Sequence, residues 1–359
     1  MDKTRSNSSG RVLEIELMKA IAIIGMVMVH VLGSSILLDI KDPKTYPVAF
    51  LIGFFGSFPS AGVFMAAMGW GAAFSKNATV STFLNRVVSL FIAGIFVNLF
   101  TQYLRAVLVP DVYGPIQNVW PYILATDIYF FAALANLYFA LMKKLESRKS
   151  LRITVSILLV GVCFLINMLV PAGSFTTGNE WLDTILGLFI RINDRSYFPF
   201  ISWIFFPVVG YGAACYFQKH GMSRTLIAGA VTGAAAVAVG LALRSALGMP
   251  LSVFAGAAGG EYYRLHPAYA LSGYAIIVIE FIIVRLILQA SGNRMPGFML
   301  TMSKTVAHIY IVQWSIISIL SPVLASITNI WINAAFGIAI LIVSYYIGIL
   351  LKKKNIIRI

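Results

Sequence analysis

Long apolar stretches recur along this chain, and each is close to the length that a helix needs to cross a lipid bilayer. A spanning helix takes about 20 apolar residues, whereas a spanning β-strand takes about ten residues of alternating character. Alternating segments of that kind are absent from the sequence. A helix also satisfies its own backbone hydrogen bonds inside lipid. The sequence therefore predicts an all-α, polytopic transmembrane helix bundle.

We expect about ten spans and no soluble domain. The chain is 59% hydrophobic and only 11% charged, whereas a soluble domain carries about 25% charged residues. Most connections between the apolar stretches are short, so residues 1–359 are expected to form a single integral-membrane domain. The expected spans lie near residues 13–35, 48–75, 84–108, 120–142, 151–171, 199–218, 224–246, 267–290, 299–321 and 328–351.

The basic excess of the chain is distributed unevenly. Lys and Arg number 27 against 13 Asp and Glu, which gives a net charge of +14. With the N-terminus inside, most basic residues fall on the cytoplasmic side, while acidic residues such as Asp39 balance the outer side. This asymmetry follows the positive-inside rule. It predicts that both termini are cytoplasmic, gives no reason to expect a nucleic-acid partner, and indicates an integral protein of the bacterial cytoplasmic membrane.

The first expected span holds the densest set of ionisable residues, namely Glu16, Lys19 and His30. Lys19 and His30 are 11 residues apart, or three helical turns plus about 20°, so they share one face over about 16 Å of rise. Glu16 lies one turn before Lys19, where the two side chains can pair. Two interpretations remain open. In the first, the residues on this face take part in catalysis. In the second, Lys19 only anchors the helix at the cytoplasmic interface, and His30 only caps its outer end.

Other spans carry isolated polar residues, which are costly inside a membrane and are candidates for function. Lys304 and His308 are four residues apart on one face of the ninth span, and Gln313 lies on a different face of it. Asp127 and Glu280 fall in the fourth and eighth spans. Each carboxylate is expected to pair with a basic residue on a neighbouring helix or to stay neutral.

The outer loops hold a second group of candidates. Glu261 and His266 lie with two tyrosines and an arginine just before the eighth span. Aromatic rings beside an acid suit a sugar, although tyrosine also belongs in an interfacial belt. The loop 247–266 contains a short apolar run, so a re-entrant segment and a compact loop are equally open.

Several common catalytic patterns are missing. The sequence has no Gly-rich nucleotide loop, no G-x-S-x-G, no H-E-x-x-H and no cluster of Cys and His. Its two cysteines, Cys163 and Cys215, both fall inside expected spans. The sequence therefore gives no support to ATP hydrolysis, serine-hydrolase chemistry or a metal site.

The residues from 11 to His30 resemble the first helix of bacterial relatives of heparan-α-glucosaminide N-acetyltransferase, and of the wider superfamily of membrane acyltransferases that modify glycans. That helix carries an acid, then Arg-Gly three residues later, then a His near its end. Here Glu16 matches the acid, Lys19 replaces the Arg, and His30 matches the His. The segments 60–70, 83–86 and 300–314 resemble the second helix, the basic entry to the third helix and the closing segment. In the closing segment Tyr310 matches a family Tyr, and Gln313 falls where many members carry His.

The resemblance implies a membrane-embedded acyltransferase. It would move an acyl group, acetyl by expectation, from cytoplasmic acyl-CoA to a hydroxyl or amine of an extracytoplasmic glycan or similar acceptor. His30 would be the general base, and the thioester donor would need no metal. Whether His30 deprotonates the acceptor or first carries the acyl group stays open. Lys19, Arg86 and Lys304 would bind the phosphates of the donor, acetyl-CoA. The acceptor would contact Asp39, Asp127, Glu261, His266, His308 and Gln313.

Two other classes remain open. A transporter or flippase would use Lys19, Asp127, Glu280 and His308 for ion coupling, although no inverted repeat is evident in the sequence. A protein that kept the fold and lost catalysis would explain Lys19 and Gln313, the two departures from the family pattern. The sequence leaves a homodimer open.

Overall fold

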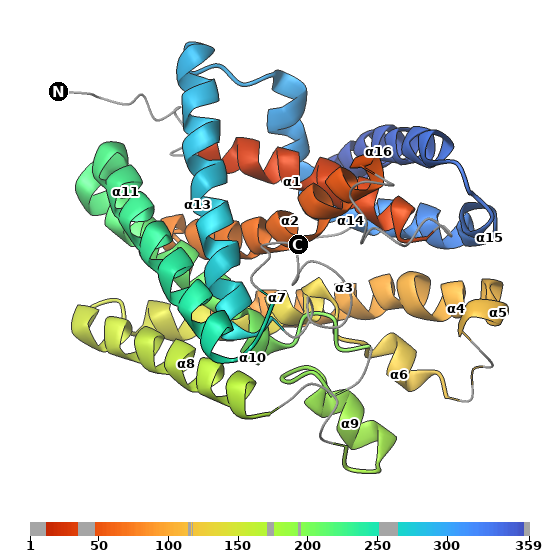
Figure 1. The fold of residues 1–359 in the computed structure, drawn as a ribbon, viewed down its shortest axis with the longest axis horizontal. Coiled ribbons are helices and arrows are strands. Elements are labelled where there is room, and N and C mark those ends of the chain that lie inside the picture. Colours follow the sequence, from red (N-terminus) through yellow and green to blue (C-terminus); the bar gives the residue numbers. More distant parts are fainter. Residues whose placement is uncertain are drawn as a thin grey trace.

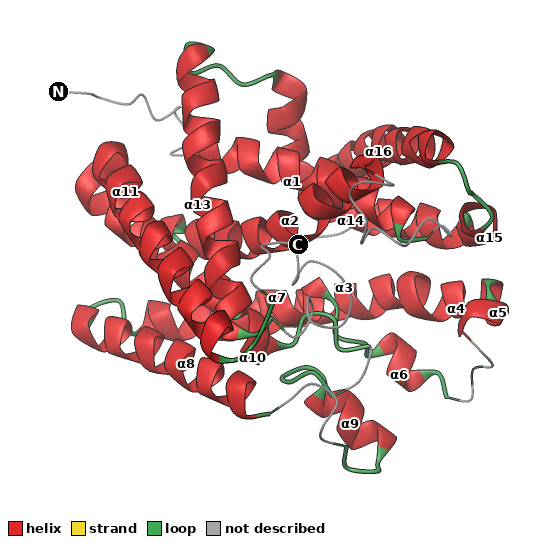
Figure 2. Ribbon diagram, viewed as in Figure 1, coloured by secondary structure: helices red, strands yellow, loops and turns green. Residues whose placement is uncertain are grey.

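The computed structural model describes residues 12–34, 47–113, 116, 118–170, 176–192, 195–250 and 265–354. The described residues are almost all helical, and no strand occurs among them (Figures 1 and 2). The helices are α1 (Leu13–Leu32), α2 (Pro47–Phe74), α3 (Val80–Asn98), η1 (Leu99–Leu104), α4 (Arg105–Leu108), α5 (Pro110–Tyr113), α6 (Trp120–Ile123), α7 (Ile128–Lys144), α8 (Lys149–Leu169), α9 (Glu180–Leu186), α10 (Phe200–Trp203), α11 (Phe205–Ala246), α13 (Pro267–Ala290), α14 (Gly297–Ile319), α15 (Ser321–Ala325) and α16 (Ile330–Lys353). The all-α prediction is confirmed.

Seven helical segments of the described chain are long and apolar enough to cross a membrane. Two long elements fall outside this set. α7 has only 17 residues, and α14 is interrupted by polar residues such as His308 and Gln313. A polar helix in a membrane bundle has to be shielded by its neighbours. The seven segments are Leu13–Leu32, Pro47–Phe74, Val80–Leu108, Lys149–Leu169, Phe200–Ala246, Pro267–Ala290 and Ile330–Lys353.

The longest element, α11, is two helices rather than one. Its 42 residues would extend about 63 Å at 1.5 Å per residue, twice the hydrocarbon thickness of a bilayer. Gly221 interrupts it with φ 75° and ψ −179°, a conformation that glycine adopts without steric cost. The two halves correspond to the expected spans 199–218 and 224–246, and Gly221 is the break between them.

The fourth expected span, 120–142, is wrong as a continuous helix. α6 ends at Ile123, and α7 begins at Ile128 with Asp127 as its N-cap in an extended conformation. The Asp127 carboxylate accepts a hydrogen bond from the Tyr129 backbone N–H, as an N-cap residue should. Hydropathy did not reveal this break, because the flanking residues are apolar. Asp127 therefore caps a helix and does not lie within one.

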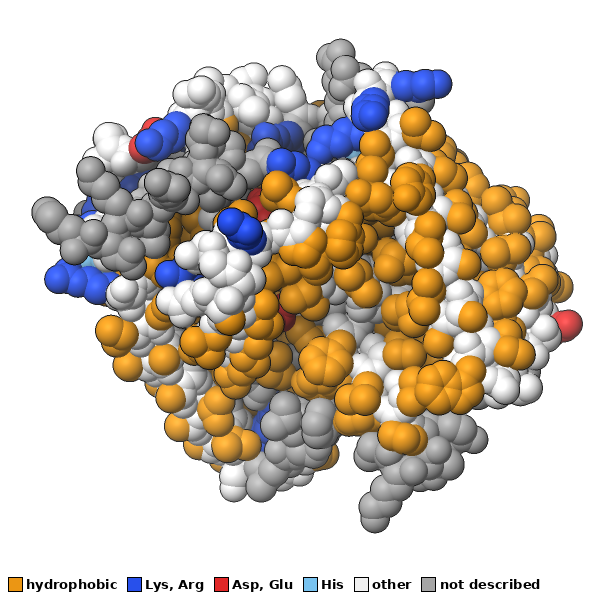
Figure 3. Space-filling model, turned by 90° about the horizontal axis from the view of Figure 1, so that it is seen from above, with side chains coloured by type: hydrophobic (Ala, Val, Ile, Leu, Met, Phe, Trp, Pro, Cys, Tyr) orange, Lys and Arg blue, Asp and Glu red, His pale blue; other side chains and the backbone are white. Residues whose placement is uncertain are grey.

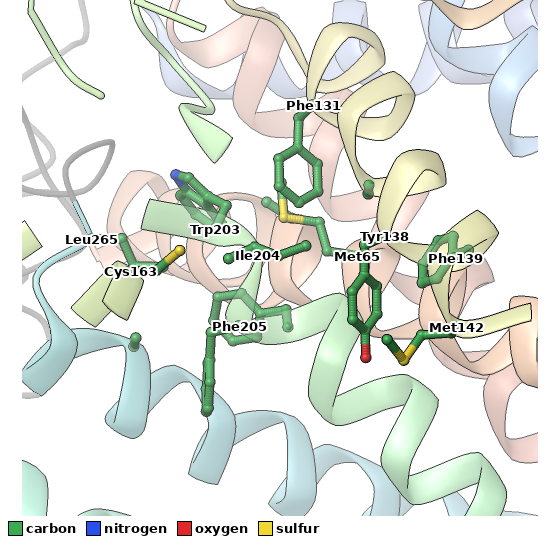
Figure 4. Packing of buried hydrophobic residues seen from close by; sticks show 14 of the residues in the cluster. Met65, Phe131, Tyr138, Phe139, Met142, Cys163, Trp203, Ile204, Phe205 and Leu265 are labelled. Carbon is green, nitrogen blue, oxygen red and sulfur yellow. The ribbon is translucent and has the colours of Figure 1, made fainter. Parts of the chain in front are cut away.

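The core is formed by large side chains from several helices that meet at α10. One cluster joins Met65, Phe131, Trp203 and Ile204, all with at most 2% of their surface exposed (Figure 4). Large apolar side chains also cover the outside of the bundle. For example, Leu169 on α8 is 70% exposed. Figure 3 shows hydrophobic side chains over much of one face, with Lys and Arg gathered towards one side of it. This surface is the kind that a lipid-facing bundle presents.

Helices α2 and α11 touch backbone to backbone. A Cβ atom at Gly69 would overlap the carbonyl oxygen of Pro207, and one at Gly210 would overlap that of Ala66. Glycine is the residue that permits such close approach between membrane helices. The contact fixes the separation of the two helices.

We expect Gly69→Ala to lower the melting temperature of the purified protein, because the added methyl group would push α2 away from α11. Overpacking of this kind costs about 1–3 kcal/mol. The matched control is Gly71→Ala, two residues further along, where nothing lies within 4 Å of an added Cβ. Thermal unfolding in detergent measures both variants. Equal melting temperatures would show that the α2–α11 contact can relax.

Candidate functional site

His30 lies in the last turn of α1, and the end of this helix is held on three sides. The last carbonyl groups of a helix lack partners within it. Here Ser34 Oγ donates to the His30 carbonyl at 2.7 Å, and Asn333 Nδ2 of α16 donates to the Val31 carbonyl at 3.3 Å. Arg105 Nη2 of α4 donates to the Gly33 carbonyl at 3.5 Å. These contacts fix the position from which His30 projects.

The imidazole of His30 packs against α14. Its Nδ1 lies 3.2 Å from Nε2 of Gln313. The Trp314 ring lies next to it, with centroids 4.2 Å apart and planes 33° apart, and the Tyr310 ring meets it edge-on at 6.1 Å. Gln313 is fully buried, whereas His30 is partly exposed. The ring is thus held in place by side chains of α14.

Tyr310 connects this cluster to Asp127. The Tyr310 hydroxyl donates to Asp127 Oδ2 at 3.0 Å, and the Tyr129 hydroxyl donates to the Ala307 carbonyl of α14 at 2.7 Å. The start of α7 is therefore tied to α14 at two points. Asp127, Tyr129 and Tyr310 are all at least 93% buried, so the carboxylate sits in a polar network inside an apolar bundle.

The break between α6 and α7 is stabilised by Asn98 at the end of α3. Its Nδ2 donates to the carbonyl groups of Ile123 at 2.9 Å and Ala125 at 2.6 Å. Thr126 Oγ1 donates to the Gly187 carbonyl at 2.7 Å. A buried backbone that leaves the helix needs such partners. Asn98 and Thr126 therefore hold the extended residues that point Asp127 towards Tyr310.

A π-helix, η1, leads from Asn98 to Arg105. Such segments are rare and are often found at functional sites. The guanidinium of Arg105 reaches the carbonyl three residues after His30. It thereby supplies a positive charge at the same end of α1.

The other end of α1 carries two ion pairs. Lys19 Nζ lies 3.1 Å from Glu16 Oε2, which confirms the predicted pairing, and Glu16 also accepts a hydrogen bond from Ser303 of α14 at 2.5 Å. Glu14 pairs with Arg285 of α13 at 2.8 Å. Lys19 keeps 23% of its side-chain surface exposed. The pair thus links α1 to α14 and leaves part of the ammonium group accessible.

The remaining candidates are not brought together. Arg86 is exposed on α3, with its guanidinium over the Phe83 ring, and Lys304 is exposed on α14, where its carbonyl accepts from Lys352. His308 is buried on α14, and His266 is the buried N-cap of α13. Asp39 and Glu261 lie outside the described residues. Of the predicted site residues that the structure describes, Gln313 is the one with a hydrogen bond to His30, while Asp127 is connected to it through Tyr310.

A separate apolar cavity of about 420 Å³ lies between α1, α2, α11 and α13. Ile15 and Met18 line it from the first half of α1, and Trp70 and Tyr274 line it from α2 and α13. His30 and Lys19 do not line it. The cavity is therefore distinct from the cluster around His30.

Sequence reasoning missed three residues of the His30 cluster. The sequence did not single out Trp314, Asn98 or Arg105 as candidates for the site. For Asn98 a usable signal existed, because a buried amide inside a span requires partners. Trp314 and Arg105 gave no such signal.

A family model described as an acyltransferase domain matches residues 12–349, so the chain belongs to that family and is a membrane acyltransferase. The match covers α1 to α16, including every described residue of the His30 cluster. None of the curated proteins matches the chain.

Proposed function

We propose that this protein transfers an acyl group, acetyl by preference, from cytoplasmic acyl-CoA to a hydroxyl or amine of an extracytoplasmic glycan or similar acceptor, with His30 as the general base. The observation that carries the proposal is the geometry at His30. The imidazole is held by Gln313 and Trp314, and His30 as a residue is partly exposed. A base that is oriented by neighbouring groups and open to a substrate is the arrangement that acyl transfer needs.

The reaction requires one proton to move from the acceptor to the leaving CoA thiolate by way of His30. The acceptor oxygen or nitrogen attacks the thioester carbonyl while His30 takes the acceptor proton. The carbon–sulfur bond then breaks, and the CoA thiolate leaves with the proton that His30 returns. Negative charge develops on the carbonyl oxygen in between, and Arg105 is the cation at this end of α1 that can stabilise it.

The donor enters from the opposite end of α1 in this proposal. Lys19 lies about 16 Å of helix rise from His30. The pantetheine arm of CoA would span this distance, with the phosphates near Lys19 and the thioester near His30. Lys19, Arg86 and Lys304 are the proposed partners of the CoA phosphates, which favour basic groups. All three are at least partly exposed.

The acceptor residues remain proposals. Asp127 and Gln313 belong to the His30 cluster, so they are the best placed of the proposed acceptor contacts. His266, His308, Asp39 and Glu261 are proposed from the sequence. The relation to heparan-α-glucosaminide N-acetyltransferase, a location in the bacterial cytoplasmic membrane and a homodimer are likewise proposed. Family membership favours this reading over a transporter or flippase.

Acetyl transfer by the purified protein tests the proposal. Protein in detergent or vesicles is given radiolabelled acetyl-CoA with candidate glycan acceptors, and both hydrolysis and transfer are measured. We expect label to leave acetyl-CoA in a way that depends on His30, as argued in the Discussion. No release of label with any acceptor would favour the transporter class or a family member that has lost catalysis.

We further propose ten spans with both termini in the cytoplasm, which places the two ends of α8 on opposite sides. Lys149 begins α8, and Glu180 follows its far end; both are exposed. In a background without Cys163 and Cys215, Glu180→Cys should react with a membrane-impermeant thiol reagent in whole cells. Lys149→Cys should react only after permeabilisation. Labelling of Lys149→Cys in intact cells would overturn this orientation.

A further inference from the structure

Gln313 is the only described side chain with a hydrogen bond to the His30 imidazole. Its own surface is fully buried, and its Oε1 has no hydrogen-bond partner among the described residues. A buried unpaired oxygen costs about 1–3 kcal/mol. The contact to His30 is thus the one interaction described for this amide, and the amide can turn without breaking another.

The orientation of this amide determines which nitrogen of His30 carries the proton. A neutral imidazole has one N–H and one lone pair. When Nε2 of Gln313 faces Nδ1, the amide donates, so the imidazole proton has to sit on Nε2. A half-turn of the amide brings Oε1 to the same place, and Nδ1 then carries the proton. The oxygen and nitrogen of an amide have nearly the same shape, so both orientations fit.

Only the second orientation makes His30 a base. A base needs the lone pair on the nitrogen that faces the acceptor, and a protonated imidazole donates from both nitrogens. In many hydrolases a carboxylate fixes the tautomer of the histidine. Here the carboxylate that the described structure connects to His30, that of Asp127, is already bonded to the Tyr129 N–H and the Tyr310 hydroxyl. The uncharged Gln313 occupies the place of that orienting group.

We propose that Gln313 is a positioning residue that presents its Oε1 to the Nδ1–H of His30 and so keeps Nε2 free to take the proton of the acceptor. The inference rests on the proposed function, in which His30 is the base. It explains how an uncharged amide can fix the tautomer of the base, a role that a carboxylate has in many hydrolases. Among the residues that the structure describes, the other charged or titratable groups around the imidazole are Arg105 at the Gly33 carbonyl, and Tyr310 with its partner Asp127.

The tautomer can be observed without any acyl transfer. The chain has only four histidines, so protein labelled with ¹⁵N-histidine gives few ring signals, and His30→Ala identifies the one from His30. We expect the wild-type signal to show protonation at Nδ1. In Gln313→Leu, which removes the amide, that preference should disappear. A wild-type ring that is protonated at Nε2, or one that is unchanged in Gln313→Leu, would overturn the inference.

Activity supplies the second readout. General-base assistance contributes about 10²–10⁴-fold, so Gln313→Leu should lower kcat by about 10²-fold and leave acetyl-CoA binding unchanged. Gln313→Glu can still accept from Nδ1–H, so it should keep the tautomer and most of the activity. Its negative charge favours the imidazolium, which moves the acid limb of the pH–rate profile to higher pH. Loss of the tautomer and of activity in Gln313→Glu would show that an acceptor oxygen at this position does not orient His30, and it would overturn the inference.

A matched control separates this effect from a general effect of leucine. Gln289→Leu makes the same change at an exposed position of α13 and should alter neither the His30 signal nor transfer. Melting temperatures identify any variant that fails to fold. If wild type shows the Nδ1–H tautomer but transfers no acetyl group, the proposed function fails while the orienting contact stands. If transfer depends on His30 but is indifferent to Gln313→Leu, the positioning role fails alone.

Discussion

His30→Ala is expected to lower acetyl transfer by about 10²–10⁴-fold, the range that general-base assistance contributes, while binding of acetyl-CoA survives. The imidazole lies at the end of α1 opposite to Lys19, so its removal leaves the proposed phosphate contacts intact. Transfer from radiolabelled acetyl-CoA and equilibrium binding of the same donor, both on purified protein, measure the two quantities.

His308→Ala is the matched comparison. It removes the second histidine proposed for the site, which is buried on α14, and it should reduce transfer less. The reverse order would identify His308 as the base. A normal rate of acetyl transfer in His30→Ala would show that His30 has no catalytic role and only caps its helix. Loss of donor binding in His30→Ala would mean that the imidazole contacts the donor and not only the acceptor.

The candidate site was partly predictable, because two of its features depend on local sequence. His30 follows Lys19 on a single regular helix, so the 3.6-residue period places both residues on one face of it. The Glu16–Lys19 ion pair follows from the same period and is present in the structure. The positions of most long helices also followed from hydropathy, because an apolar stretch inside lipid has to form its hydrogen bonds within itself, but the expected span 120–142 did not.

The rest depends on contacts between distant segments. Gln313 was expected near the acceptor on the basis of a resemblance, but its contact with His30 joins residues 283 positions apart. Asp127 was expected inside a span, but hydrogen bonds that Asn98 and Thr126 form with segments distant in the sequence stabilise a break in the helix there. Hydropathy does not distinguish an apolar helix from an apolar segment whose backbone is satisfied by a neighbouring helix.

Lys19 stands where the first helix that this chain resembles carries an arginine, and its contacts bear on what a lysine there can do. An arginine could hold a phosphate through two parallel hydrogen bonds, whereas a lysine offers a compact point charge. Glu16 lies against Lys19 and is itself held by Ser303 of α14. Glu16 can therefore keep Lys19 charged and in place, or it can compete with the donor for it.

We expect Lys19→Met to weaken acetyl-CoA binding by about ten- to a hundred-fold, the equivalent of one charge-assisted contact of about 1.5–3 kcal/mol. Lys19→Arg should retain the affinity, because the charge is kept. Equilibrium binding of acetyl-CoA to each purified variant measures the effect. Equal dissociation constants for wild type and Lys19→Met would remove Lys19 from the donor site and leave it as an anchor for Glu16.

The double variant Glu16→Gln with Lys19→Met distinguishes a direct contact from an indirect one. Removing Lys19 alone leaves the Glu16 carboxylate without its cation, and that unpaired charge could repel the donor phosphates or disturb α14. If the loss arises in this way, neutralising Glu16 in the double variant restores the affinity. If Lys19 touches the donor, the double variant binds as weakly as Lys19→Met. A double-mutant cycle of this kind is required because residues in contact do not contribute additively.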